Sequence, residues 1–281
     1  MRVIHKLKQK LFSRNSSNLS SSRLIKTKSK VDSRLLFKTR FGDYFWLNPN
    51  KYLDQTIIDT GIFEDKSTAV VERLVKKNDI VLDIGANIGY YTVIFSRLVS
   101  SSGKILAFEP TKYYRDVLNK NLAVNKVKNC KVYDFGLSNK KQELEIFIGD
   151  CSATIHWASD NAPAAKEKIL LKTLDEFIGE NPLKKLDFIK IDVDGHEPSF
   201  FEGAWETLER YDPIVLLEVN QENYLKAGCT AWDFYDLLKQ KGYKIYSEDE
   251  IKEFSSKRDF LIKCANFAYS ANIVISRKKI Q

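Results

Sequence analysis

Six side chains of this chain stand at or just beyond the ends of short apolar runs, and their types suit proton transfer and the binding of hydroxyls or cations. They are Asp83, Glu109, Asp192, His196, Glu197 and Glu218. An ionised carboxylate accepts hydrogen bonds and attracts cations, whereas an imidazole titrates near neutral pH and can take up a proton. If the apolar runs are strands of one parallel sheet, their carboxyl ends meet at one edge, and we expect these groups to converge there.

The stretch DIVLDIGANIGYYT, residues 79–92, predicts the element around which the sheet is organised. Residues 80–84 form an apolar run rich in β-branched side chains, which indicates a strand buried on both faces. The chain then turns through GANIG, and from Tyr90 to Val99 the apolar residues recur at helical spacing. Gly85 and Gly89 let the backbone pass close to a ligand, so this strand, turn and helix predict a nucleotide-binding α/β unit.

The composition of the turn separates two classes of cofactor. A dinucleotide places its pyrophosphate at a helix N-terminus, usually on a GxGxxG pattern, but GANIG lacks the second glycine and Asp83 would repel a pyrophosphate. S-adenosylmethionine carries an ammonium and a sulfonium instead, which suits an acid at the strand end. A second strand, KILAFEP at 104–110, ends in Glu109, whose carboxylate can accept hydrogen bonds from the ribose of either cofactor.

We therefore expect S-adenosylmethionine as the cofactor. The residues expected to form its pocket are Asp83, Gly85, Ala86, Asn87, Gly89, Tyr90, Glu109, Pro110, Gly136 and Asp192.

Three motifs resemble, in this order, the FkbM family of S-adenosylmethionine-dependent methyltransferases. They are LDIGANIGYYT at 82–92, AFEP at 107–110 and IDVDGHEPSFFEGA at 191–204. The resemblance covers about residues 41 to 275 and implies an α/β fold, a Rossmann-like seven-stranded class I methyltransferase sheet with helices on both faces. It also implies O-methylation of a hydroxyl on a sugar, a glycan or a secondary metabolite.

The remaining patterns predict the other elements of such a sheet. We expect strands at 131–137, 143–148, 169–171, 186–191, 213–219, 243–247 and 272–276, with antiparallel pairing open for the last. We expect helices at 68–76, 111–125, 174–178, 198–210 and 231–241. Glu197 is the expected cap of the helix that begins at Pro198.

Methyl transfer to a hydroxyl requires positioning of the acceptor and removal of its proton. Asp192 and Glu218 follow strands and are expected to point toward the acceptor, while His196 and Glu197 lie just beyond Asp192. We hypothesise metal-independent general-base catalysis, with Asp192 as the base and His196 or Glu197 assisting. Two other interpretations stay open: the acids hold a divalent cation, or Glu197 only caps a helix and His196 lies on the surface.

The net charge of +8 has its origin in the N-terminal residues. Residues 1–40 contain twelve Lys or Arg and one Asp, a net charge of +11, so the rest of the chain carries −3. We expect a basic, largely disordered extension at 1–40, with little order over 11–33, and a methyltransferase domain at 41–281 that binds no nucleic acid. Residues 1–12 are either a solvated extension or a short amphipathic segment with weak contact to anionic lipid or a partner.

Four cysteines lie far apart without a CxxC pair, and no apolar run approaches the roughly twenty residues that span a bilayer. These features predict reduced thiols, no structural zinc site at the cysteines and a cytoplasmic protein. The polar segment 149–168 predicts a long loop, in which Ser152, His156 and Trp157 are candidates for binding the acceptor. A loop without a ligand fits this composition nearly as well.

Two other functions are compatible with the overall pattern. One is an NAD-dependent oxidoreductase on a similar sheet, which the turn GANIG disfavours. The other is a cofactor-binding module without catalysis, which the acids after the fourth and fifth strands disfavour. A methyltransferase with a small-molecule, sugar or glycan acceptor is the expectation that these residues favour.

Overall fold

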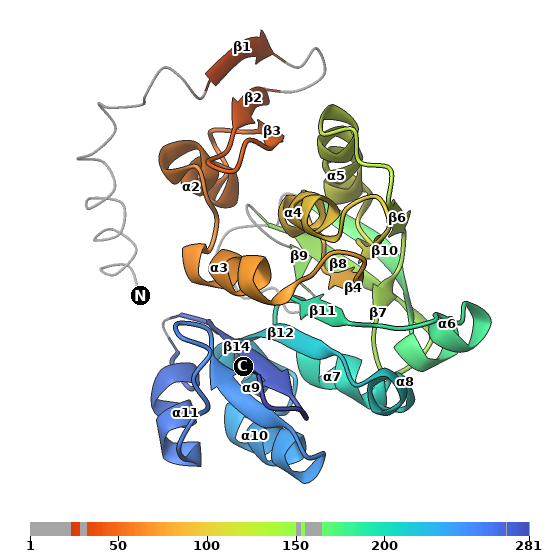
Figure 1. The fold of residues 1–281 in the computed structure, drawn as a ribbon, viewed down its shortest axis with the longest axis vertical. Coiled ribbons are helices and arrows are strands. Elements are labelled where there is room, and N and C mark those ends of the chain that lie inside the picture. Colours follow the sequence, from red (N-terminus) through yellow and green to blue (C-terminus); the bar gives the residue numbers. More distant parts are fainter. Residues whose placement is uncertain (1–23, 29–32, 150–152, 155–164, 268, 281) are drawn as a thin grey trace. The chain divides into compact units, whose positions relative to one another are not determined.

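The computed structural model describes residues 24–28, 33–149, 153–154, 165–267 and 269–280 (Figure 1). The described residues form two compact units that divide between Phe63 and Glu64. The boundary expected at residue 40 falls inside the first unit, and the division into an extension and a catalytic domain stays a prediction. No helix in the described part of the chain has the length and apolar content that crossing a membrane requires.

The first unit is a three-stranded antiparallel sheet followed by a helix. Its elements are β1 (Leu24–Lys28), β2 (Leu35–Lys38), β3 (Tyr44–Leu47) and α2 (Tyr52–Thr60). The alternating pattern of β3 buries Phe45 and Leu47 completely. Arg34 donates a hydrogen bond of 2.8 Å to Asp54, and this buried pair links the residue before β2 to α2. β1 lies within the stretch for which we expected little order, and α2 was not predicted.

A seven-stranded sheet forms the centre of the second unit. In spatial order its strands are β13 (Lys244–Ser247), β14 (Ala271–Ser276), β12 (Ile214–Val219), β11 (Phe188–Ile191), β4 (Ile80–Ile84), β5 (Lys104–Phe108) and β6 (Cys130–Tyr133). The strands from β12 to β6 are parallel, whereas β14 pairs antiparallel with β12 and β13. The predicted seven-stranded sheet is confirmed, and its last strand is antiparallel.

Helices cover both faces of this sheet. They are α3 (Asp65–Leu74), α4 (Tyr90–Val99), α5 (Lys112–Val124), α6 (Leu174–Glu180), α7 (Glu197–Glu202), α8 (Trp205–Tyr211), α9 (Gln221–Lys226), α10 (Ala231–Gln240) and α11 (Lys257–Cys264). From β4 the chain passes through α4 to β5 and through α5 to β6, toward one edge of the sheet. From β11 it passes through α7 and α8 to β12, toward the other edge. Right-handed crossovers therefore place these two pairs of helices on opposite faces, as Figure 1 shows. The order reverses between β4 and β11, where doubly wound sheets bind ligands.

A smaller sheet of the same unit lies between β6 and α6 in the sequence. Its strands, in spatial order, are β7 (Gly136–Leu137), β10 (Ala165–Lys172), β8 (Gln142–Ile148) and β9 (Ala153–Thr154). Ile146, Ile169 and Leu171 form a small buried cluster on it. The strands predicted at 143–148 and 169–171 are confirmed, but their membership in a separate sheet was not predicted.

Two predicted elements are divided in the structure. The strand expected at 131–137 becomes β6 and β7, which belong to different sheets. The helix expected at 198–210 becomes α7 and α8, and Gly203, which lies between them, packs closely against the backbone of Ser138. α7 begins at Glu197, so His196 is its N-cap residue and the prediction that Glu197 caps the helix is wrong. Helices α9 and α11 were not predicted.

Candidate functional site

A cavity lies at the carboxyl ends of β4, β5 and β11, where the strand order reverses. Of the residues expected from the sequence, its lining includes Gly85, Asn87, Glu109, Pro110, Gly136, Asp192 and His196. Asp194 also lines it, so the described lining contains three carboxylates and one imidazole, and none of the described lining residues is Lys or Arg. The structure thus brings together groups from three strands that lie far apart in the sequence.

The turn from β4 into α4 approaches β11 closely because Gly85 has no side chain. Gly85 has a φ of +78°, and a Cβ there would lie 1.9 Å from the carbonyl oxygen of Asp192. The backbone N–H groups of Gly85 and Ala86 each donate to the carbonyl of Phe108 at 3.0 Å. These contacts fix the turn between β11 and β5, and they place its backbone in the cavity wall.

Glu109 follows β5 and holds the next segment of the wall in place. Its Oε2 accepts a hydrogen bond of 2.8 Å from the N–H of Asn87, and its Oε1 accepts from the N–H and hydroxyl of Thr111 at 3.0 and 2.6 Å. Burial raises the pKa of Glu109, and these hydrogen bonds oppose that rise. A carboxylate offers about four acceptor positions. Oε2 can therefore accept one further hydrogen bond from a ligand.

Asp192 follows β11 and forms an ion pair with a buried lysine. The Nζ of Lys190 lies 2.9 Å from Oδ2 of Asp192 and 4.6 Å from the centroid of the Tyr91 ring. Burial opposes the charge on Lys190, but the carboxylates of Asp192, Glu64 and Asp83 outweigh it and raise the pKa of this lysine. Lys190 therefore stays charged, and a proton on Asp192 would remove its closest counter-charge.

His196 enters the lining through a tight turn after Asp192. Asp194 and Gly195 have φ values of +57° and +98°, and a Cβ on Gly195 would lie 2.3 Å from Cβ of Asn223. The Nε2 atom of His196 lies 2.8 Å from Oγ of Ser138, which is fully buried just after β7. This contact between the two segments orients the imidazole at the cavity.

An apolar wall completes the cavity on the side of the smaller sheet. Tyr114 of α5 and Ile146, Ile169 and Leu171 of β8 and β10 form it beside Gly136. A Cβ on Gly136 would lie 2.7 Å from Cδ2 of Leu171, so glycine allows the strands to pack together here. We did not predict these apolar residues. Alternation in the two strands marks their apolar faces, but only the pairing of the smaller sheet determines which face meets the cavity.

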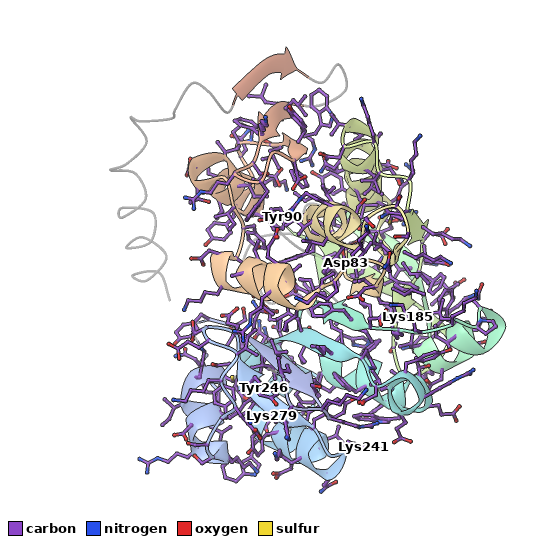
Figure 2. All side chains as sticks on the ribbon, in the orientation of Figure 1. Asp83, Tyr90, Lys185, Lys241, Tyr246 and Lys279 are labelled. Carbon is purple, nitrogen blue, oxygen red and sulfur yellow. The ribbon has the colours of Figure 1, made fainter. Side chains whose placement is uncertain are left out.

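Six of the residues expected from the sequence do not belong to the described lining. They are Asp83, Ala86, Gly89, Tyr90, Glu197 and Glu218. Asp83 is buried in β4, where the hydroxyl of Thr92 donates to its carboxylate and burial raises its pKa to about 6. Tyr90 belongs to α4 (Figure 2) and is buried. Its hydroxyl lies 3.3 Å from that of Thr68. Ala86 and Gly89 belong to the turn backbone, and Gly89 is the N-cap of α4.

Glu197 and Glu218 interact with Asp192 but do not belong to the described lining of the cavity. Glu197 is fully buried, and its Oε1 accepts a hydrogen bond of 2.9 Å from the N–H of Val193, which braces the turn. Burial raises the pKa of Glu197 to about 8. Burial and the neighbouring carboxylates of Asp192 and Glu197 raise the pKa of Glu218 well above its ordinary value. Direct roles for these two residues in catalysis stay predictions.

The segment expected to bind the acceptor lies mostly outside the described residues, including Ser152, His156 and Trp157. Ala153 and Thr154 of this segment form β9, and Ala153 lines the cavity. Among the residues that the structure describes, no three His, Cys, Asp or Glu side chains are grouped so that they could hold a metal ion.

The family model of the FkbM methyltransferase domain matches residues 83–245, which is more than half of the chain. The chain belongs to the FkbM methyltransferase family. It is therefore an S-adenosylmethionine-dependent methyltransferase with the Rossmann-like class I fold, as its motifs predicted. The model of protein-L-isoaspartate(D-aspartate) O-methyltransferase also matches, over residues 5–151.

Curated relatives of this FkbM methyltransferase include three proteins of different length. Methyltransferase sdnD of Sordaria araneosa is 27% identical over 203 residues, which are 60% of this chain and 74% of that protein. The hexuronic acid methyltransferase AglP of Haloferax volcanii is 24% identical over 191 residues, 66% of this chain and 71% of AglP. The AMB antimetabolite synthetase AmbE of Pseudomonas aeruginosa is 24% identical over 71% of this chain, which spans only 11% of AmbE.

Solved structures similar to the chain include a methyltransferase FkbM from Methylobacillus flagellatus. It is 15% identical with a TM-score of 0.45, and the match covers 71% of this chain and 43% of that chain. An O-methyltransferase from Bacillus cereus is 16% identical with a TM-score of 0.43, over 74% of this chain and 76% of that one.

The cavity of this FkbM methyltransferase is lined by groups that suit S-adenosylmethionine. Three carboxylates suit a ligand that carries an ammonium, a sulfonium and ribose hydroxyls, and the apolar wall suits an adenine ring. A pyrophosphate would meet these carboxylates without a lysine or arginine in the described lining to compensate. The cofactor expected from the turn therefore fits the residues present, and a dinucleotide does not.

Proposed function

We propose that this FkbM methyltransferase transfers a methyl group to a hydroxyl oxygen of a sugar, a glycan or a secondary metabolite. The observation that carries the proposal is the composition of the described lining, with three carboxylates, one imidazole and no Lys or Arg. Carboxylates bind a cationic cofactor and accept hydrogen bonds from hydroxyls, and an imidazole can accept the proton that a hydroxyl must lose. The similarity to the hexuronic acid methyltransferase AglP supports a sugar acceptor.

S-adenosylmethionine supplies the methyl group on a sulfonium that leaves as a neutral thioether. We propose that Glu109 accepts a hydrogen bond from a ribose hydroxyl through Oε2, whose remaining acceptor position is available. The turn at Gly85 and Asn87 forms the wall beside the ribose, and Asp192 provides the negative charge for the cationic part of the cofactor. Pro110 and Gly136, together with the apolar wall, receive the adenine.

We propose His196 as the general base, in place of Asp192, which was expected from the sequence. A proton on Asp192 would remove the closest counter-charge of buried Lys190, whereas His196 is bonded to the neutral hydroxyl of Ser138. An imidazole also titrates close to neutral pH, which favours proton transfer in both directions. His196 takes up the proton of the acceptor hydroxyl, and Asp192 keeps its ion pair throughout.

A carboxylate is the second candidate acceptor, because a hexuronic acid carries a carboxyl group beside its hydroxyls and the isoaspartate O-methyltransferase model also matches. The three carboxylates of the described lining disfavour it, since they repel an anionic acceptor. The two candidates differ in their need for a base, because a carboxylate has no proton to lose at neutral pH.

Product analysis tests the proposal and separates these two acceptors. The protein is incubated with S-adenosylmethionine carrying a deuterated methyl group and a panel of uronic acids, neutral sugars and metabolites with free hydroxyls. A methyl ether is stable in mild alkali, whereas a methyl ester is hydrolysed with release of methanol. We expect labelled, alkali-stable product from neutral sugars or other hydroxyl compounds. Alkali-labile product from uronic acids alone would contradict hydroxyl methylation.

A further inference from the structure

A chain of hydrogen bonds connects His196 with Glu202 through two residues that follow β7. Nε2 of His196 lies 2.8 Å from Oγ of Ser138, which donates to Oδ1 of Asn139 at 3.3 Å. Nδ2 of Asn139 in turn donates to Oε2 of Glu202 at 2.8 Å. We propose that Ser138 and Asn139 are positioning residues that hold His196 as the tautomer protonated on Nε2. This inference rests on the proposed function, in which His196 is the base. In this tautomer Nδ1 carries no proton, and it would take up the proton of the acceptor.

The direction of the chain follows from counting hydrogens. The carboxylate of Glu202 only accepts, so Asn139 must turn its NH₂ group toward it, and Oδ1 of Asn139 then faces Ser138. Oγ of Ser138 carries a single hydrogen. If that hydrogen pointed to His196, two oxygens would face each other at 3.3 Å with no hydrogen between them. We therefore place the hydrogen on the bond to Asn139, which makes Nε2 of His196 the donor to Ser138.

The backbone is arranged so that this chain can form. Ser138 is fully buried, whereas Asn139 and Glu202 are exposed and can be varied without disturbing the core. A Cβ on Gly203 would lie 2.1 Å from the carbonyl oxygen of Ser138, so glycine lets the end of α7 rest on the segment 138–139. His196 precedes α7 and Glu202 ends it, which means that one short helix carries both ends of the chain.

The same chain favours the charged form of His196 after proton uptake. Each hydrogen bond then runs from the imidazolium toward the carboxylate of Glu202, and bonds aligned in one direction strengthen one another. The chain thus sets which nitrogen is the base and stabilises the cation that results. Ser138 and Asn139 act through His196, and they need not touch the acceptor.

Nitrogen-15 NMR of the imidazoles tests the tautomer directly and requires no acceptor. The protein has three histidines, so comparison with His196→Gln assigns the His196 signals. At pH 8 we expect His196 of the unchanged protein to show the Nε2–H pattern. In Asn139→Ala, the hydroxyl of Ser138 has lost its acceptor and can donate its hydrogen to Nε2 of His196. We then expect the signals to shift toward the Nδ1–H pattern. Lys140→Ala, an exposed change at the next position, should leave them unchanged.

Kinetics give the second readout, with an acceptor found by product analysis. We expect Asn139→Ala to lower kcat about tenfold while the KM values for both substrates change less than twofold, and Lys140→Ala to have the kcat of the unchanged protein. An Nδ1–H pattern in the unchanged protein, or the same pattern in Asn139→Ala as in that protein, overturns the inference. Neither NMR result depends on methyl transfer, so a failure of the proposed function would be recognised separately.

Discussion

Asp192 and His196 line the same cavity but differ in what the uptake of a proton would do to their neighbours. Asp192 compensates the charge of Lys190, a cation buried in the central strand β11. Protonation of Asp192 would therefore weaken an ion pair whose cation cannot reach water. The hydroxyl of Ser138, which is hydrogen-bonded to His196, carries no charge. These neighbours support our proposal that Asp192 binds the cofactor and that His196 accepts the proton.

His196→Gln should lower turnover without weakening cofactor binding. Glutamine keeps a polar side chain of similar reach but cannot take up a proton at neutral pH, so we expect kcat to fall by about 10²-fold or more. Calorimetry with S-adenosylhomocysteine should give a dissociation constant within about threefold of the original. Turnover close to normal in a folded His196→Gln protein would show that another group is the base.

Glu109→Gln should weaken cofactor binding. The amide cannot accept at both ends, so its NH₂ group would face either the N–H of Asn87 or the N–H of Thr111. Because hydrogen bonds to charged groups contribute about 1.5–3 kcal/mol, we expect the affinity for S-adenosylhomocysteine to fall by that amount. An unchanged affinity by calorimetry would exclude Glu109 from ribose binding. Glu206→Gln, an exposed position, is the matched control.

Glu197→Gln should change how stability depends on pH. Burial raises the pKa of Glu197 from its ordinary value of 4.5 to about 8. Between these values the folded protein keeps a proton that the unfolded chain releases, so this residue makes stability fall as the pH rises through the window. Glutamine removes that contribution.

We therefore compare the melting temperatures of Glu197→Gln and the unchanged protein at pH 5, 6.5 and 8. The difference, variant minus unchanged protein, should increase as the pH rises. Buried acids that do not interact with Glu197 contribute to both proteins alike, so the difference reports Glu197 together with its effect on Glu218. Glu206→Gln serves again as the exposed control. A constant difference across the three pH values would mean that Glu197 is ionised in the folded protein.

At the scale of elements, the turn between β4 and α4 shows how glycine positions a site. Gly85→Ala would place a Cβ 1.9 Å from the carbonyl of Asp192 at a φ of +78°. The positive φ costs about 1–2 kcal/mol and overpacking about 1–3 kcal/mol, so chemical denaturation should show a loss of roughly 2–5 kcal/mol. Gly179→Ala in α6 meets nothing within 4 Å and should stabilise the protein slightly. Equal effects of the two changes would contradict the close approach.

The sequence predicted those elements whose pattern is local. The strands β4, β11, β12 and β14 were predicted correctly, because burial on both faces leaves a continuous apolar signature, whereas the direction of β14 had been left open. The smaller sheet was missed, since its pairing joins β7 and β10 across about thirty residues and depends on tertiary contacts. The apolar cavity wall was missed for the same reason. Lys190 was not singled out because a single charge in an apolar strand does not indicate its partner.

At the scale of the whole molecule, the basic residues are concentrated at the N-terminus. Residues 1–33 contain nine Lys or Arg and one Asp, a net charge of +8, so the remaining residues are neutral in sum. The described lining of the cavity, in contrast, consists of residues between 84 and 196, all in the second unit. The basic stretch and the residues that line the cavity therefore belong to different parts of the chain, and truncation can separate their contributions.

Deletion of residues 1–33 should leave cofactor binding intact while it reduces binding to polyanions. The deletion removes β1, which pairs with β2 at the edge of the first sheet, but no residue of the described lining. We expect calorimetry to give an affinity for S-adenosylhomocysteine within about twofold of the full chain. Elution from heparin should move to lower salt, because the charge that attracts polyanions is gone.

Deletion of residues 1–23 alone, which retains β1, separates loss of charge from loss of the strand. A tenfold loss of cofactor affinity after removal of 1–33, but not of 1–23, would show that the first unit contributes to the site.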